Sequence, residues 1–290
     1  MQEIGSCSKP KLWQQVHKRE PNMSFKLACR AICAVSATVA VVSAHAAPLM
    51  PDFANVPTGW TVDRYDPTSF SNVGSYQGRS DVLGIEITSA GNLANRPAAY
   101  QSSFYNTQGR QHLISGGTGS SIAADLYIPS AWRDAASGNV RSDMWGVMSD
   151  ATAAVSAYPI IGFTNYGGAA RYRVFDGDVS GGWVDSSVAV AFDAWTSFEI
   201  DFTGTAFNFL INGSTVYTDS TIDGTTGFSA VIMQAYNFAD PAIGNPVPVL
   251  ADYTAHWSNV SANAVPEPGS LALIGVALVG LVVSRRRRAV

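Results

Sequence analysis

Hydrophobic and polar residues alternate in short runs through the middle of the chain, between residues 47 and 264. The runs are rich in β-branched and aromatic residues, and Gly, Asn, Asp and Ser separate them. Alternation with a period of two is typical of strands, whereas the region shows no convincing helical pattern. The predicted strands are 82–88, 98–105, 121–128, 144–149, 159–164, 170–175, 195–203, 206–211, 215–218, 228–235 and 253–260. Many short strands joined by polar turns favour an all-β, antiparallel sandwich.

The best-defined part of this pattern is the stretch 195–219. Phe198, Ile200 and Phe202 alternate with polar residues, so one face of the predicted strand is apolar. Asn212-Gly213 follows the next strand, and both residue types tolerate the positive φ angles of a two-residue hairpin turn. The stretch therefore predicts a β-hairpin with one buried face.

This stretch resembles the late hairpins of concanavalin A-like jelly rolls, including laminin G-like and legume-lectin-like domains. The shared features are a tryptophan, an alternating strand, and a strand that ends in Asn-Gly before a Val-Tyr pair. The runs 124–129 and 253–260 fit inner-sheet strands of such a fold. The resemblance implies a jelly-roll fold for residues 47–264, and a fold alone does not specify an activity.

Residues 1–46 have the features of a signal peptide. Lys26 and Arg30 form a basic region, the run 31–42 is apolar, and residues 43–46 read Ser-Ala-His-Ala. This order predicts cleavage by signal peptidase after Ala46. We expect translation to start at Met23, because the polar stretch before it is foreign to a signal peptide. The alternative is an N-terminal membrane anchor, for which the apolar run is short.

The C-terminal region, 265–290, combines a short motif, an apolar run and a basic cluster. Pro266, Glu267 and Pro268 precede the uncharged run 271–283, and four arginines follow: Arg285, Arg286, Arg287 and Arg288. The run predicts a single transmembrane helix, although a full crossing takes about 20 residues. The arginines would stay on the cytoplasmic side and leave the body outside. An ordinary tail anchor is the alternative interpretation.

The same three features in this order resemble the PEP-CTERM sorting signal of Gram-negative bacteria that make exopolysaccharide. The resemblance implies that an exosortase, a membrane cysteine transpeptidase, recognises the tripeptide Pro266-Glu267-Pro268 and cleaves or transfers the protein near it. The protein would cross the inner membrane and be anchored there transiently. It would then reach the cell surface or the extracellular space.

Charge and cysteine content exclude several functions for the body. The stretch 47–264 contains eight arginines, no lysine and 19 acidic residues, a net charge of −11 within a chain of −4. Such a body repels phosphate backbones, so nucleic-acid binding is not expected. Cys7, Cys29 and Cys33 all precede residue 47, so the body lacks a disulfide and a cysteine metal site.

Candidate catalytic residues are sparse. Glycoside hydrolases with a jelly-roll fold carry a Glu-x-Asp-x-x-Glu strand motif, in which the two glutamates act as nucleophile and acid. This chain offers Glu199 and Asp201, but Gly204 stands where the second glutamate would be. A retaining mechanism needs two carboxyl groups about 5 Å apart. We therefore predict a protein that is not an enzyme, with a jelly-roll glycoside hydrolase acting on polysaccharide as the alternative.

Candidate binding residues are few as well. Trp183 lies in a glycine-flanked loop and could stack on a sugar, although a core position is the usual place for a tryptophan. Asp176 and Asp178 form a compact loop with oxygen ligands suited to calcium, although turn aspartates commonly cap their own backbone. No other cofactor is expected. The sequence thus predicts a non-enzymatic envelope or matrix protein, either a binding module for extracellular polysaccharide or a structural one.

Overall fold

The computed structural model describes residues 51–135, 138–239 and 252–263, all of which fall within the predicted 47–264 domain. The predicted signal peptide, the sorting tripeptide, the helix 271–283 and the arginine cluster lie outside the described residues. Within the described part of the chain, no helix is long and apolar enough to cross a membrane.

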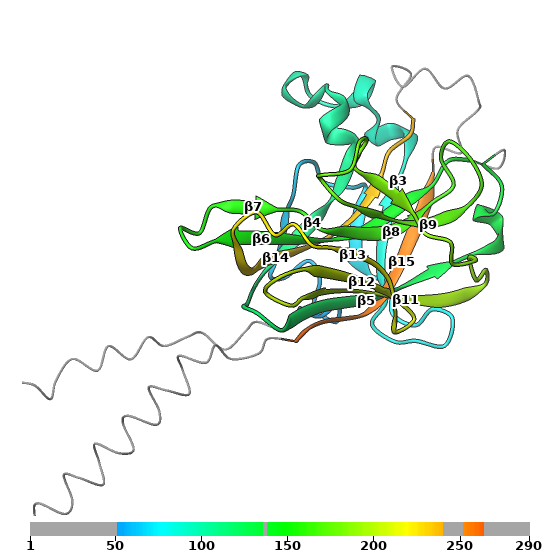
Figure 1. Cartoon of the computed structure of the whole chain (residues 1–290). Coiled ribbons are helices and arrows are strands. Elements are labelled where there is room, and N and C mark those ends of the chain that lie inside the picture. Colours follow the sequence, from blue (N-terminus) through cyan, green and yellow to red (C-terminus); the bar gives the residue numbers. More distant parts are fainter. Residues whose placement is uncertain (1–50, 136–137, 240–251, 264–290) are drawn as a thin grey trace, which may run out of the picture. The chain divides into compact units, whose positions relative to one another are not determined.

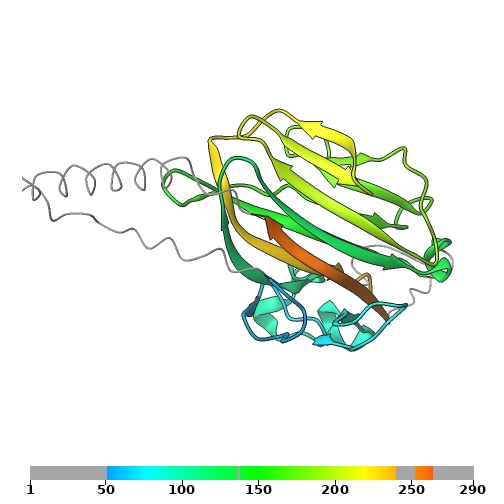
Figure 2. The same cartoon turned by 90° about the horizontal axis from the view of Figure 1, so that it is seen from below.

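The described residues form two antiparallel sheets that lie one above the other (Figure 1). Sheet A has the order β1 (Trp60–Val62), β4 (Thr107–Gly116), β14 (Thr225–Tyr236), β6 (Arg141–Asp150), β8 (Ile160–Thr164), β9 (Arg171–Phe175) and β10 (Trp183–Asp185), with β7 (Val155–Ala157) beside β6. Sheet B has the order β13 (Ser214–Asp219), β12 (Phe207–Ile211), β11 (Ala194–Phe202), β5 (Ser120–Ile128), β15 (Tyr253–Asn263), β3 (Leu83–Ile87) and β2 (Ser69–Asn72). Figure 2 shows sheet B from its outer side, with β13 in yellow and β15 in orange. The predicted all-β antiparallel sandwich is confirmed.

The hydrophobic core fills the space between the sheets. Strand alternation turns Phe198 and Ile200 of β11 and Met233 of β14 into this space, where all three are fully buried. Trp257 of β15 is also fully buried, and its indole N–H donates to the Ser142 hydroxyl of β6 at 2.9 Å. This hydrogen bond joins the two sheets through the core.

The predicted hairpin is present between β12 and β13. Asn212 and Gly213 have φ angles of +49° and +76°, as a two-residue turn of the expected type requires. The Asn212 side chain also accepts a hydrogen bond from the backbone of Ser197 on β11, at 2.9 Å. The turn is therefore tied to a third strand.

The predicted strand 98–105 is wrong. Residues 98–105 instead lie in and between the short 3-10 helices η3 (Ala98–Tyr100) and η4 (Ser103–Asn106), which follow η1 (Ser89–Gly91) and η2 (Leu93–Asn95). A further 3-10 helix, η5, spans Ser130–Trp132. Arg96 is buried and donates to the carbonyl oxygens of Tyr100 and Ser102, so the chain curls around its guanidinium. Five strands were not predicted from the sequence: β1, β2, β4, β7 and β10.

The segment η1–η4 lies on the side of sheet A that faces away from sheet B (Figure 1). The guanidinium of Arg64 joins it to the sheet, because it lies 4.9 Å from the ring centre of Phe104 in η4 and 4.5 Å from that of Trp145 in β6. The segment η1–η4 therefore lies along part of the outer face of sheet A.

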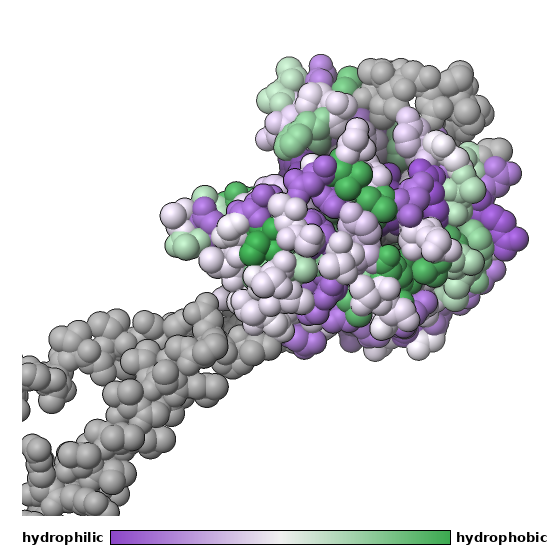
Figure 3. All heavy atoms as spheres, in the orientation of Figure 1, coloured by the Kyte–Doolittle hydropathy of each residue, from purple (hydrophilic) through white to green (hydrophobic). Residues whose placement is uncertain are grey.

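In Figure 3 hydrophobic residues occur in small groups among hydrophilic ones over the visible face.

Candidate ligand-binding site on the outer face of sheet A

Two rows of side chains run across the strands on the outer face of sheet A. Residues directly opposite one another in antiparallel strands project from the same face. The register places Gln234, Asp143, Gly162, Arg173 and Asp185 in one row, from β14 to β10. The neighbouring row contains Ile232, Trp145, Ile160, Phe175 and Trp183. A polar row therefore lies directly beside an apolar and aromatic one.

Asp143 is the centre of the polar row and is fully buried. Its Oδ2 atom accepts hydrogen bonds from Nε of Arg141 at 2.5 Å and from Nε2 of Gln234 at 2.7 Å. Gly162 lies opposite on β8, and a Cβ atom there would stand 2.4 Å from Oδ1 of Asp143. The carboxylate fits because the neighbouring strand has no side chain at this position.

Four buried polar atoms in these two rows have no hydrogen-bond partner among the described residues. They are Oδ1 of Asp143, Oε1 of Gln234, Nε of Arg173 and Nε1 of Trp145. Native proteins leave few such atoms, because an unpaired buried polar group costs about 1–3 kcal/mol. Here two acceptors and two donors gather on β14, β6 and β9, and β8 with its Gly162 lies between the last two. We call Arg141, Asp143, Trp145, Arg173, Trp183 and Gln234 the outer-face site.

Arg173 and Trp183 are stacked at one end of the site. The Cζ atom of Arg173 lies 3.6 Å from the ring centre of Trp183, and that of Arg141 lies 4.7 Å from it. Burial lowers the pKa of Arg173 to about 10, the Asp143 carboxylate opposes this shift, and nearby Arg141 adds to it. At neutral pH the group is still charged, so the site contains a buried cation against an aromatic ring.

The backbone beneath the site is fixed from the core. The Ser142 hydroxyl donates to the Gln234 carbonyl oxygen at 2.7 Å and accepts from Trp257. The Tyr253 hydroxyl bonds to the backbone of Arg141 and of Tyr236, which lie on adjacent strands β6 and β14. Trp257 and Tyr253 of sheet B therefore hold β6 and β14, the two strands that carry most of the site.

Trp183 is the one predicted binding residue that lies in the outer-face site. Its side chain is half-buried, and its role as a glycan contact stays a prediction. The sequence reasoning missed Asp143, Arg173 and Gln234. The alternation in Arg171-Tyr172-Arg173-Val174-Phe175 was a usable signal, because it places both arginines on one face of the strand. The predicted strand 144–149 began too late to include Asp143.

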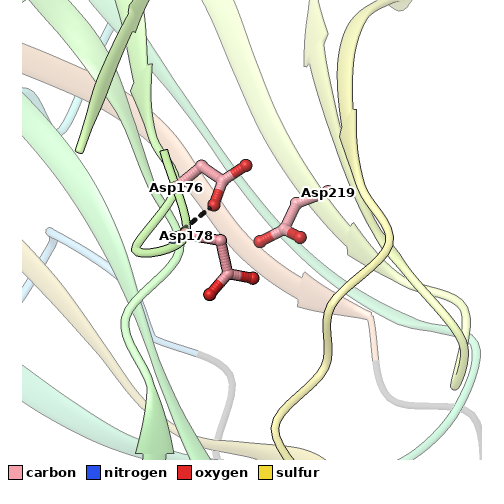
Figure 4. A group of neighbouring side chains, drawn as sticks. All are labelled: Asp176, Asp178 and Asp219. Carbon is pink, nitrogen blue, oxygen red and sulfur yellow. Dashed lines mark hydrogen bonds between the residues drawn. The ribbon is translucent and has the colours of Figure 1, made fainter. Parts of the chain in front are cut away.

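The predicted metal ligands lie in a separate cluster of carboxylates (Figure 4). Oxygen atoms of Asp176, Asp178 and Asp219 lie within 4.8 Å of one another. Asp176 is buried, and its oxygens accept from the backbone N–H of Asp178 at 2.8 Å and from the Tyr217 hydroxyl at 2.6 Å. The latter bond raises the pKa of Tyr217 to about 12. Calcium at Asp176 and Asp178 stays a prediction, and the structure adds Asp219 to the candidate ligands.

Glu199 and Asp201, the two acidic residues of the incomplete hydrolase motif, lie on β11 of sheet B. They alternate with the core residues Phe198, Ile200 and Phe202, so they project from the outer face of that sheet. The outer-face site is on sheet A, on the opposite side of the core. The acidic residues of the incomplete hydrolase motif and the outer-face site therefore lie on different faces of the sandwich.

Comparison with known proteins identifies one motif by sequence. Residues 264–288 match the model of the PEP-CTERM protein-sorting motif, which confirms the resemblance drawn from Pro266, Glu267, Pro268 and the arginine cluster. The motif implies export, membrane-anchored sorting and processing by an exosortase in a Gram-negative bacterium. No curated protein matches the chain by sequence.

Solved structures of similar shape are distant in sequence. They include a Crh5 transglycosylase in complex with NAG, at 14% identity over 76% of this chain and 85% of that one, with a TM-score of 0.46. A Bacillus licheniformis β-glucanase has 13% identity over 77% and 100% of the two chains and a TM-score of 0.44. SCLam, a non-specific endo-β-1,3(4)-glucanase from family GH16, has 11% identity over 74% and 90% and a TM-score of 0.46. The chain is thus a β-sandwich that carries a PEP-CTERM sorting motif.

Proposed function

We propose that the protein is an exosortase-sorted, non-enzymatic module of the cell envelope or matrix that binds extracellular polysaccharide through the outer-face site. The observation that carries the proposal is the set of four buried polar atoms on β14, β6 and β9 that have no partner among the described residues. Sugar hydroxyls both donate and accept hydrogen bonds, and the site offers two unpaired acceptors and two unpaired donors.

The aromatic row supports the same ligand class. Trp183 is half-buried, and Arg173 covers one face of its indole. A sugar ring would stack on the solvent-exposed part of Trp183, and its hydroxyl groups would reach the polar row once a covering side chain moves aside. Ligand sites commonly combine an apolar wall with a few convergent polar groups in this way.

The carboxylates of the site favour binding over hydrolysis. Asp143 is held by Arg141 and Gln234, and Asp185, at the end of the polar row, pairs with Arg171 at 2.8 Å. Acid–base hydrolysis of a glycosidic bond needs two carboxyl groups that flank it. The hydrolase alternative would have to rely on Glu199 and Asp201 of the other sheet.

A polysaccharide pull-down with the exported protein tests the proposal. Trp183→Ala and Gln234→Leu should each weaken retention at least about tenfold, because they remove the ring and one polar contact. Glu199→Gln, on the other sheet, is the control and should bind like the wild type. If no polysaccharide is retained, the binding role is wrong and a purely structural role gains support. Turnover of β-glucan that Glu199→Gln abolishes would establish the hydrolase instead.

A further inference from the structure

Arg173 is a buried cation that forms no direct ion pair with a described residue, although the Asp143 carboxylate in the same row partly offsets its charge. Its exposed fraction is 7%, and no hydrogen bond or ion pair to a described residue is present. The neighbouring arginines are paired, Arg141 with Asp143 and Arg171 with Asp185. Asp185 and one oxygen of Asp143 are therefore occupied, and the other Asp143 oxygen makes no hydrogen bond to Arg173. A buried charge without an ion pair lowers the stability of the fold, and an anion from outside the chain would neutralise the charge of Arg173.

The geometry of Arg173 specifies how such an anion would bind. The guanidinium lies with Cζ 3.6 Å from the ring centre of Trp183, so one of its flat faces is covered. Its N–H donors lie in the guanidinium plane and point out from the edge. A carboxylate matches two of these donors at once, an arrangement that a neutral hydroxyl cannot reproduce.

We infer that the outer-face site recognises a sugar unit that bears a carboxylate, as in uronate-containing polysaccharides. Arg173 binds the carboxylate, and the unpaired oxygens of Asp143 and Gln234 accept from neighbouring hydroxyl groups. This inference rests on the proposed polysaccharide-binding function and narrows its ligand class.

The net charge of −11 on the body does not conflict with a carboxylate ligand. Interactions between exposed charges are largely screened beyond about 8–10 Å at physiological salt. Recognition here concerns one carboxylate at one buried guanidinium, not a long row of phosphates. The affinity should accordingly change little between low and physiological salt, unlike that of a polyanion receptor.

Calorimetric titration of the exported protein with matched oligosaccharides tests the inference. The probes are an oligogalacturonate, its methyl ester, and a sulfated neutral oligosaccharide of similar length. We expect the free acid to bind at least about tenfold more tightly than the ester, because the ester lacks the charged acceptor. Arginine can also bind a tetrahedral oxyanion through two oxygens, so the sulfated probe tests whether any anion suffices. We expect it to bind less tightly than the free acid, because its sulfate is held one bond farther from the sugar ring than the carboxylate of a uronate.

Arg173→Gln tests the contribution of the guanidinium to binding apart from that of the other residues of the site. This variant should bind acid and ester alike, at the affinity that the wild type shows for the ester. Arg133→Gln is the matched control, because it makes the same change in net charge at an exposed arginine that stacks on Phe192. It should keep the full preference for the acid.

The outcomes distinguish this inference from the function on which it rests. Equal binding of acid and ester by the wild type would overturn carboxylate recognition and leave polysaccharide binding intact. Equal binding of the sulfated probe would make the site a general anion receptor and overturn the inference as stated. If no probe binds and polysaccharide pull-down also fails, both proposals fall together.

Thermal unfolding of Arg173→Gln provides a second readout. Because the substitution removes an unpaired buried charge, we expect a melting temperature equal to or above that of the wild type. The oligogalacturonate should raise the melting temperature of the wild type and of Arg133→Gln only. A large fall in Arg173→Gln would show that Arg173 holds the fold together, which would overturn its assignment as a ligand contact.

Discussion

At the scale of single residues, charged groups that look equivalent in the sequence differ in how deeply the fold buries them. Arg171 and Arg173 are two positions apart on β9 and lie on the same face. Arg171 has an exposed partner in Asp185, whereas Arg173 is buried without one. The alternation was readable from the sequence, but the covering ring of Trp183 was not, because it comes from a strand that the sequence did not predict. Which arginine lacks a partner is a property of the packing.

Asp219 provides a residue-scale prediction about stability and pH. Burial raises the pKa of its carboxyl group, and the carboxylates of Asp176, Asp178 and Asp223 raise it further. The folded state therefore binds this proton more tightly than the unfolded state, and stability falls as the pH rises through the raised pKa. Asp219→Asn should stabilise the protein at pH 7 by about 0.5 kcal/mol, because the group is partly exposed.

Urea unfolding at several pH values measures this effect. The gain from Asp219→Asn should vanish near pH 3, where the wild-type carboxyl group is protonated as well. Destabilisation at pH 7 with calcium chelated would contradict the expected repulsion. In the same assay, added calcium should stabilise the wild type and not the variant if the predicted metal site at Asp176 and Asp178 is real.

At the scale of elements, strands with a clear apolar and polar alternation were predictable, and elements built around a single polar residue were not. The hairpin at Asn212-Gly213 follows from local backbone preference, so the sequence was sufficient. The segment 89–106 contains Tyr100, Phe104 and Tyr105, which favour a strand, yet most of its residues are Ala, Asn and Ser and it curls around the buried Arg96. The edge strand β10 has only three residues, too few for a periodic pattern.

Gly213→Ala tests the hairpin. An added Cβ would meet no atom within 4 Å, so the cost comes from the backbone alone, at φ +76°. We expect a loss of about 1 kcal/mol in the free energy of unfolding. Gly177→Ala is the control, because its Cβ would also meet nothing and its φ is not positive. Chemical denaturation should show no loss for Gly177→Ala, and equal losses in both variants would exclude backbone strain at the turn.

At the scale of the whole molecule, the sorting motif and the sandwich have separate tasks. The motif at 264–288 directs the protein to its destination, while the described core lies within residues 51–263. The sequence identified the motif because its order of tripeptide, apolar run and arginines is local. The ligand site depends on four strands distant in sequence, so a linear pattern could not reveal it.

Glu267→Ala tests whether the sorting motif directs the protein to the cell surface or the extracellular space. If the tripeptide is what the exosortase recognises, the variant should remain in the membrane fraction as an unprocessed form while the wild type is released or transferred. Cell fractionation with immunoblotting measures this. Glu199→Gln, in the body, should be sorted normally. Normal processing of Glu267→Ala would show that Glu267 is not the recognition residue.

The stack of Trp183 on Arg173 also has a kinetic consequence. Nε of Arg173 and Oδ1 of Asp143 are closed off from solvent, so a ligand that reaches them must displace a covering side chain. Trp183 lies on a three-residue edge strand, bonded on one side only to β9, and such short edges open locally at low free-energy cost. Ligand entry would then be gated: association would proceed at the rate at which this edge opens, well below the diffusion limit.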